Sequence, residues 1–203
     1  MISCQRDLLR REVASITKMM TFYSALKLCQ RYSIDPEKTF LTVSRGAAKI
    51  TGTSADLREG DTLSIQQLFY GMMLPSGNDA AFLLAEYFGS ILRTKKYFSC
   101  DINKKSVHSS QDTNISTAKV HQPNSAFANH PTLKYFLKEM NDNAFRLKLV
   151  DTQYDSPHGL MNRNNFSSAY DICLLANECM QMPEFREVVS CPFYETKAVR
   201  NQK

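Results

Sequence analysis

The 203 residues are enough for one domain, and a hydrophobic content of 43% can fill a core, which excludes wholesale disorder. The 25 basic and 20 acidic residues give a mild net charge of +5, without the basic, aromatic-bearing stripe typical of nucleic-acid binding. No window approaches the ~20 continuous apolar residues of a transmembrane helix, and the charged start lacks the apolar core of a secretory signal.

The first third of the chain alternates helical and extended patterns. Apolar residues at helical spacing predict a helix over Ser15–Gln30, with its first serine at or near the start as a favoured cap. A short strand is expected at Phe40–Val43, followed by a polar, glycine-containing connection over Thr51–Asp61. A second helix is predicted over Leu63–Leu74, where the following proline ends it.

The middle of the chain combines a helix with a long polar stretch. A third helix is expected over Asp79–Phe88, with Asn78 or Asp79 as its cap. Residues 93–131 are rich in Ser, Asn, Lys and Thr and show little periodicity, which predicts a flexible surface insertion. Order resumes with a helix over Thr132–Leu147, and a turn is expected at Ser156–Leu160.

The last third predicts a helix over Ser167–Met182, a short helix over Pro183–Val189, and a strand beginning within Phe193–Val199. The six cysteines contain no C-x-x-C pair, which argues against a zinc site. Cys29 and Cys173 lie in helical apolar patterns and are interpreted as small core residues. The predicted inward face of the 167–182 helix consists of Ala169, Ile172, Cys173, Ala176 and Met180.

A serine and a lysine at the start of the first helix suggest nucleophilic chemistry. Positions i and i+3 share a helix face, so the Ser15 hydroxyl can meet the Lys18 amine. The positive helix N-terminus and burial both lower the pKa of a lysine, as a base requires. The pattern alone is weak, because S-x-x-K recurs at Ser24–Lys27 and Ser116–Lys119 and because a solvated surface lysine would look the same.

The tripeptide Ser76-Gly77-Asn78 supplies further candidates. It is the only S-x-N in the chain and lies in the turn between two apolar helices. Ser76 offers a hydroxyl for proton relay, Asn78 an amide for holding a substrate, and Gly77 a tight turn that lets backbone approach a ligand. An ordinary helix-capping turn is the alternative interpretation.

Together with their flanks, the two motifs resemble the serine D-Ala-D-Ala carboxypeptidases, the low-molecular-mass penicillin-binding proteins of peptidase family S11. The similar segments are ASITKMMTFYSAL, LREGDTLSIQQLFYGMMLPSGNDAAFLLAEYFGS and YFLKEMNDNAFRLKLVDTQYDSPHGL. The resemblance implies a β-lactamase/transpeptidase-like α/β fold, a monomer, and no metal or organic cofactor. Members are usually secreted or periplasmic, but with no signal visible the compartment stays open.

The resemblance also implies roles for the site residues. Ser15 attacks the carbonyl between two terminal D-alanines, and Lys18 takes its proton. Ser76 passes a proton to the leaving D-alanine, Asn78 holds the lysine amine and the substrate amide, and Gly77 completes this substrate-binding turn. Water then hydrolyses the acyl-enzyme, and a β-lactam can replace the peptide ending in D-Ala-D-Ala. In this family the segment containing His158 is mainly structural.

The family's third motif, Lys-Thr-Gly, is absent. The KITG of Lys49–Gly52 does not replace it, because it has an extra residue and precedes the S-x-N motif. Residues 1–203 are therefore expected to form part of an S11 domain, mostly its helices, with an incomplete antiparallel sheet. A non-hydrolytic penicillin-binding-like pseudoenzyme or acyl-binding protein is the main alternative. A β-lactamase or serine glutaminase follows, although SGN in place of SDN argues against a class A lactamase.

Overall fold

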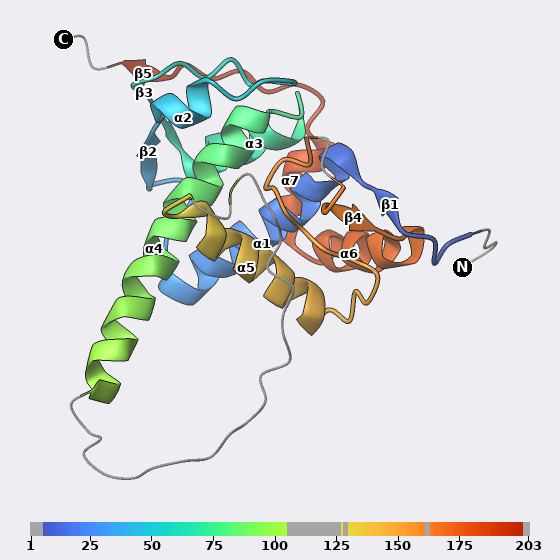
Figure 1. Cartoon of the computed structure of the whole chain (residues 1–203). Coiled ribbons are helices and arrows are strands. Elements are labelled where there is room, and N and C mark those ends of the chain that lie inside the picture. Colours follow the sequence, from blue (N-terminus) through green and yellow to red (C-terminus); the bar gives the residue numbers. More distant parts are fainter. Residues whose placement is uncertain (1–5, 105–126, 128–129, 161–162, 201–203) are drawn as a thin grey trace.

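The computed structural model describes residues 6–104, 127, 130–160 and 163–200. Helices form most of the body, and two small antiparallel sheets flank it (Figure 1), so the predicted α/β class is confirmed. The helices are α1 (Thr17–Tyr32), α2 (Arg45–Ala48), α3 (Ile65–Met73), α4 (Asn78–Lys104), α5 (Leu133–Arg146), α6 (Ala169–Met180) and α7 (Pro183–Ser190).

Five short strands make up the two sheets. β1 (Arg11–Glu12) pairs with β4 (Phe166–Ser167). In the second sheet, β3 (Asp61–Ser64) lies between β2 (Phe40–Thr42) and β5 (Val199–Arg200). β2 and β3 are neighbours in the sequence, whereas β1 and β5 each pair with a strand far away along the chain, so the first strand is tied to residues 166–167 and the last to residues 61–62.

The helix α1 runs through the centre of the helical body and contacts α3, α4, α5 and α6. The ring of Phe22 packs on Phe69 of α3 at 4.2 Å and on Phe185 of α7 at 5.1 Å between centroids. Fully burying a phenylalanine contributes about 2 kcal/mol, so these contacts anchor the helix firmly. The predicted helix is thus confirmed, although Ser15 lies in a 3₁₀ turn before α1 and makes no side-chain capping bond.

The second predicted helix starts two residues later than expected because Leu63 and Ser64 belong to β3. Leu63 pairs with Leu41 of β2. The Ser64 hydroxyl then accepts a hydrogen bond from the Gln67 amide, and the Gln67 side chain accepts one from the Ser64 amide. This capping box marks the true start of α3.

The third helix, α4, is far longer than expected. It runs for 27 residues to Lys104, so residues 93–104, where the sequence showed little periodicity, are helical. Lys95 and Lys96 lie over the rings of Tyr32 and Tyr135, each at 5.8 Å, which ties this part of α4 to the end of α1 and to α5. The rest of the predicted insertion, 105–126 and 128–129, lies outside the described residues.

The predicted inward face of α6 is wrong. Asp171, Leu175 and Cys179 are buried, whereas Cys173 and Met180 are exposed. Because α6 is apolar on several sides, its periodicity could not identify the buried face. The buried face is fixed by the carboxylate of Asp171, which accepts hydrogen bonds from Thr152 Oγ1 at 2.7 Å and from the backbone N–H of Asp151 at 2.8 Å. Cys29 of α1 is buried, as predicted.

The helices predicted over residues 132–147 and 183–189 are confirmed as α5 and α7. The strand predicted over residues 193–199 is wrong except at Val199. Side chains hold this segment instead: Tyr194 stacks on Tyr70 at 3.9 Å, and Thr196 accepts a hydrogen bond from Gln67 at 2.5 Å.

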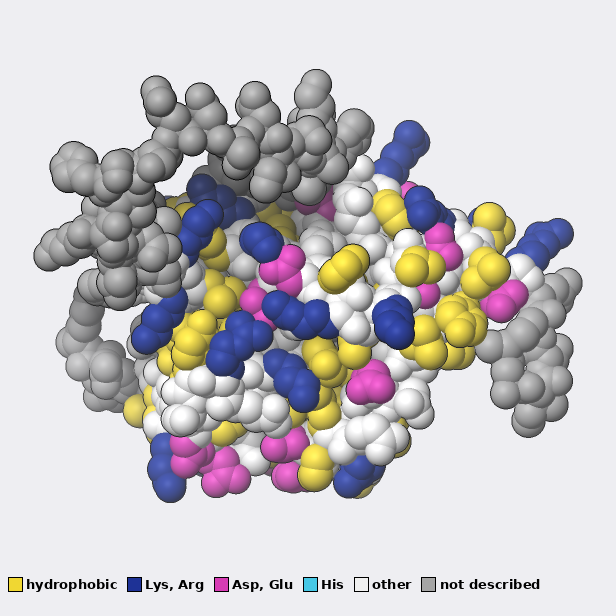
Figure 2. All heavy atoms as spheres, turned by 90° about the horizontal axis from the view of Figure 1, so that it is seen from below, with side chains coloured by type: hydrophobic (Ala, Val, Ile, Leu, Met, Phe, Trp, Pro, Cys, Tyr) yellow, Lys and Arg dark blue, Asp and Glu magenta, His cyan; other side chains and the backbone are white. Residues whose placement is uncertain are grey.

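The surface shown in Figure 2 mixes both signs of charge. Lysine and arginine side chains lie among carboxylates and apolar groups, in keeping with the scattered charges of the sequence. Within the part of the chain that the structure describes, no helix has both the length and the apolar character needed to cross a bilayer.

Candidate active site

The predicted site residues meet at one atom, the Nζ of Lys18. It lies 3.0 Å from Ser15 Oγ, 3.2 Å from Ser76 Oγ and 2.7 Å from Asn78 Oδ1. The backbone oxygen of His158 is a fourth neighbour at 3.1 Å. Two motifs sixty residues apart and a turn in the last third of the chain therefore share a single cluster.

The cluster combines an accessible hydroxyl with a buried amine. Ser15 is exposed and Ser76 half-buried, whereas Lys18 is only 2% and Asn78 only 3% exposed. Burial disfavours the ammonium form and lowers the pKa of Lys18 to about 8, while the nearby carboxylate of Asp79 opposes the shift. A substantial share of the amine is therefore free at mildly alkaline pH.

The hydrogen-bonding partners of Lys18 also fit a neutral amine. The His158 carbonyl oxygen can only accept a hydrogen bond. The same holds for Asn78 Oδ1, which faces Lys18 because the side-chain nitrogen of Asn78 donates to Thr51 O at 2.9 Å. A neutral amine has two N–H groups for these two acceptors and one lone pair left over. That lone pair can accept the hydroxyl proton of Ser15, so Lys18 has the arrangement of a general base.

The turn that carries Ser15 is strained and tightly packed. Ala14 has a φ of 41°, which is rare for a residue with a side chain. Gly159, with a φ of 75°, lies against it so closely that a methyl group there would overlap the Ala14 carbonyl oxygen. The Gly159 amide donates to Ser156 Oγ at 2.8 Å. The turn over residues 156–160 therefore fixes the backbone before Ser15 and also presents the His158 oxygen to Lys18.

We expect Gly159→Ala to lower the free energy of unfolding by about 3 kcal/mol, from backbone strain plus overlap with Ala14. Gly60→Ala is a matched control, because Gly60 has a φ of 88° but open space around its Cα. It should cost about 1 kcal/mol, from strain alone. Urea unfolding of both variants measures the difference, and equal losses would contradict the packing argument.

The loop with Ser76 is held from two sides. The Gly77 amide donates to Gly71 O at 3.1 Å, and a Cβ on Gly77 would lie 2.5 Å from that oxygen. Thr53 Oγ1 donates to Ser76 O at 2.6 Å, and the backbone oxygen of Thr53 accepts from the backbone N–H of Asn78 at 2.8 Å. Gly77 therefore allows this loop to approach α3 closely, a contact that the sequence analysis did not predict.

The Lys49–Gly52 segment contacts the site in a different role from the missing third motif. Thr51 O accepts a hydrogen bond from the side-chain amide of Asn78. Gly52, with a φ of 95°, lies where a Cβ would be 2.5 Å from Asn78 Nδ2. This segment fixes the orientation of the Asn78 side chain. Sequence reasoning missed this support, because the contact joins residues 27 positions apart.

Asp79 is a second residue that sequence reasoning identified only as a cap. Its buried carboxylate accepts from the amides of Ala55 and Leu57 and from Ser54 Oγ, at 2.7–3.2 Å. Asp79 thereby ties the 54–57 loop to the start of α4. It is also the negative charge that opposes the lowering of the Lys18 pKa.

His158 contributes its backbone to the cluster. Its Nδ1 accepts the Leu160 amide at 3.1 Å, so the neutral ring carries its proton on Nε2. Among the described residues, the buried Nε2 has no hydrogen-bond partner. Burial, followed by the charge of Lys18, lowers the pKa of His158 to about 4, which keeps the ring neutral at physiological pH. A structural role for this histidine, as expected, fits these observations.

The other S-x-x-K pairs do not form a comparable cluster. Ser24 is buried and accepts a hydrogen bond from Asn143 Nδ2 at 3.0 Å, while Lys27 lies over the Tyr23 ring at 5.5 Å. The pair Ser116–Lys119 lies outside the described residues.

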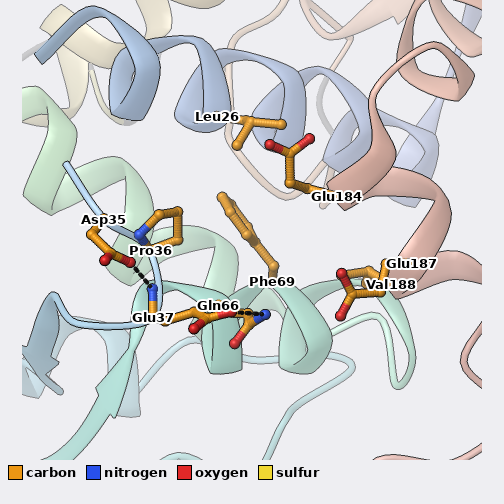
Figure 3. Close-up of a pocket in the computed structure, with 9 residues that line it drawn as sticks. All are labelled: Leu26, Asp35, Pro36, Glu37, Gln66, Phe69, Glu184, Glu187 and Val188. Atoms are coloured by element: carbon orange, nitrogen blue, oxygen red, sulfur yellow. Dashed lines mark hydrogen bonds between the residues drawn. The ribbon is translucent and has the colours of Figure 1, made fainter. Parts of the chain in front are cut away.

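A separate hollow of about 170 Å³ lies between α1, α3 and α7 (Figure 3). Carboxylates surround an apolar floor formed by Leu26 and Phe69. None of its lining residues belongs to the Lys18 cluster, which remains the candidate site. The lining residues are Leu26, Asp35, Pro36, Glu37, Gln66, Phe69, Glu184, Glu187 and Val188.

Comparison with known proteins gives one consistent family. The sequence model of the family described as "D-alanyl-D-alanine carboxypeptidase" (Peptidase_S11) matches residues 2–106 and 125–201. The chain is 30% identical over 195 residues to a D-alanyl-D-alanine carboxypeptidase of Streptomyces sp. (strain K15), covering 94% of this chain and 53% of that protein. It is 29% identical over 188 residues to the D-alanyl-D-alanine carboxypeptidase DacD of Escherichia coli, covering 89% and 38%.

Solved structures agree with these matches. The Streptomyces K15 DD-transpeptidase superposes with a TM-score of 0.71 at 26% identity, over 98% of this chain and 63% of that one. Penicillin-binding protein 6B of Escherichia coli gives 0.69 at 25% identity, over 99% and 53%. The chain thus spans about half the length of the first of these curated relatives and less of the second.

Proposed function

Because this chain belongs to the D-alanyl-D-alanine carboxypeptidase family, peptidase family S11, we propose that it takes part in serine-dependent hydrolysis of peptides ending in D-Ala-D-Ala. The observation that carries the proposal is the Lys18 amine, buried and within 3.0 Å of the Ser15 hydroxyl. A serine becomes nucleophilic when an adjacent base accepts its proton. Residues 1–203 are taken as part of one S11 domain.

In the proposed acylation, Ser15 Oγ attacks the carbonyl carbon of the penultimate D-alanine while its proton moves to Lys18 Nζ. The Ser15 backbone N–H is assigned as one donor to the developing oxyanion, an interaction that contributes about 3 kcal/mol in comparable enzymes. The C–N bond then breaks, leaving an ester on Ser15. The departing amine takes a proton from Ser76 Oγ, which is replenished by Lys18 across 3.2 Å.

Deacylation reverses this proton path with water in place of D-alanine. Water attacks the ester carbonyl, its proton passes to the Lys18 amine, and Ser15 Oγ leaves and regains a proton. Asn78 keeps one N–H of the amine engaged throughout, at 2.7 Å, and is assigned to hold the substrate amide. Ser76, Gly77 and Asn78 together form the proposed substrate-binding turn.

The test uses two assays on the full native chain. A fluorescent penicillin is expected to label Ser15 covalently, as mapped by peptide mass spectrometry, and an N-acylated peptide ending in D-Ala-D-Ala is expected to release D-alanine. Labelling without release would favour the acyl-binding alternative, and rapid penicillin turnover would favour a β-lactamase. If the chain shows neither labelling nor release, the proposal is refuted.

A further inference from the structure

We propose that Phe127 is a positioning residue of this active centre. Its ring packs between Phe82 of α4 and the imidazole of His158, and so holds the His158 carbonyl against the Lys18 amine. The inference rests on the proposed function, because it concerns the same general base. It goes further by assigning a role in catalysis to a residue from the end of the region predicted as a flexible insertion.

The ring contacts are direct. The Phe127 centroid lies 5.8 Å from that of His158, with the planes at 82°, and 6.0 Å from that of Phe82, at 62°. Both partners are nearly inaccessible, with 3% exposed for His158 and 4% for Phe82. Edge-to-face pairs at such distances stabilise by about 1 kcal/mol beyond the area they bury.

Phe127 is bonded to His130, which is tied to α4, and this helps to hold the ring in place. The His130 amide donates to Phe127 O at 2.9 Å. The His130 ring packs edge-to-face on Phe82 at 5.8 Å, and its Nε2 lies 3.7 Å from Glu86 Oε1. Gly89 of α4 lies directly against the carbonyl of Thr132, leaving no room for a side chain. His130 and Thr132, which precede α5, are therefore packed along the helix that begins at Asn78.

Packing matters at His158 because polar contacts fix only part of it. Its Nδ1 accepts the Leu160 amide, but its Nε2 has no hydrogen-bond partner among the residues described. The edge-to-face contact with Phe127 therefore supplements the single hydrogen bond to the ring. Removing Phe127 would let water reach Nε2 and let the turn shift. The Lys18 amine would then lose a well-placed acceptor and part of its desolvation.

Exchange of Phe127 changes no charge in the cluster, so any change in pH dependence must come from geometry or hydration. The titratable groups on the elements packed around Phe127 and Lys18 are Asp79 and Glu86 on α4, His130 before α5, His158 in the 156–160 turn and Asp155 just before that turn.

The experiment compares Phe127→Ala with the conservative Phe127→Leu and with Phe185→Leu, which perturbs the core at the Phe22 ring of α1, outside the Lys18 cluster. The rate of Ser15 acylation by penicillin is measured against pH. For Phe127→Ala we expect a roughly ten- to hundredfold loss at pH 7. The midpoint of the pH profile should rise, because a better hydrated Lys18 holds its proton more tightly. Phe127→Leu should recover most of the rate.

Phe185→Leu should lower the melting temperature without moving the midpoint. An unchanged midpoint and rate in Phe127→Ala, relative to Phe185→Leu, would overturn the inference. A ¹³C NMR titration of the Lys18 Cε resonance measures the pKa of the amine directly, without any catalytic turnover. The Lys18→Arg variant, which lacks this resonance, identifies it in the spectrum. If the native chain is not acylated at all, the proposed function fails, but this titration still decides whether Phe127 controls the amine.

Discussion

The Ser15→Ala variant is expected to lose covalent labelling by penicillin and to release D-alanine at least about 10⁴-fold more slowly than the native chain. The reason is that Ser15 Oγ is the exposed hydroxyl within 3.0 Å of a buried amine, and alanine leaves no atom to form the ester. In-gel fluorescence after incubation with labelled penicillin, together with a D-alanine assay, measures both losses.

Ser24→Ala is the matched control, because Ser24 belongs to another S-x-x-K but is buried beside Asn143. This control should keep its label at temperatures where the protein remains folded. Label retained in Ser15→Ala, or lost in folded Ser24→Ala, would show that the nucleophile has been assigned to the wrong serine.

Replacing Lys18 by glutamine is expected to slow acylation by about 10³-fold, within the range by which general-base catalysis accelerates reactions. Lys18→Arg should be equally slow, because a guanidinium stays protonated and cannot accept the Ser15 proton. Lys27→Gln, in the other described S-x-x-K pair, should remain close to the native rate. Stopped-flow acylation with a chromogenic β-lactam distinguishes these variants, and circular dichroism checks that each is folded.

The native pH profile follows from the same residue. The pKa of Lys18 is lowered to about 8, so at pH 7 only about one amine in ten is free, and the rate of acylation should rise with pH through about 8. Glutamine at position 18 should remove this limb of the profile. A native rate that is flat between pH 6.5 and 9 would show that a group other than Lys18 takes the proton.

Much of the helical structure was predictable because amphipathic segments carry their own signal. The period of α1 and α5 could be read directly, and the proline after α3 marked its end. The strands β1, β4 and β5 have two residues each, too few for any alternation to show. The face of α6 was misjudged for a related reason, since a partner distant in sequence decides which side of an apolar helix is buried.

The active-site residues likewise fall into those with a local sequence signal and those without one. Ser15, Lys18, Ser76 and Asn78 were identified from motif order and spacing, and the structure brings them together. The groups that hold them were not identified, because their contacts span long separations. The bond from Lys18 to the His158 oxygen crosses 140 positions, and Asp79 acts on a loop more than twenty residues before it. No local pattern reports such contacts.

The backbone around the cluster has a wider consequence. Ala14, which precedes Ser15, and Ser76, which belongs to the Lys18 cluster, adopt φ values of 41° and 60°, in the region where residues other than glycine, asparagine and aspartate are rarely found. Each such conformation costs on the order of 1–3 kcal/mol and persists only because its surroundings enforce it. Evolution toward heat tolerance alone would be expected to relax these two positions early, and the protein would become more stable while Ser15 lost its orientation toward Lys18.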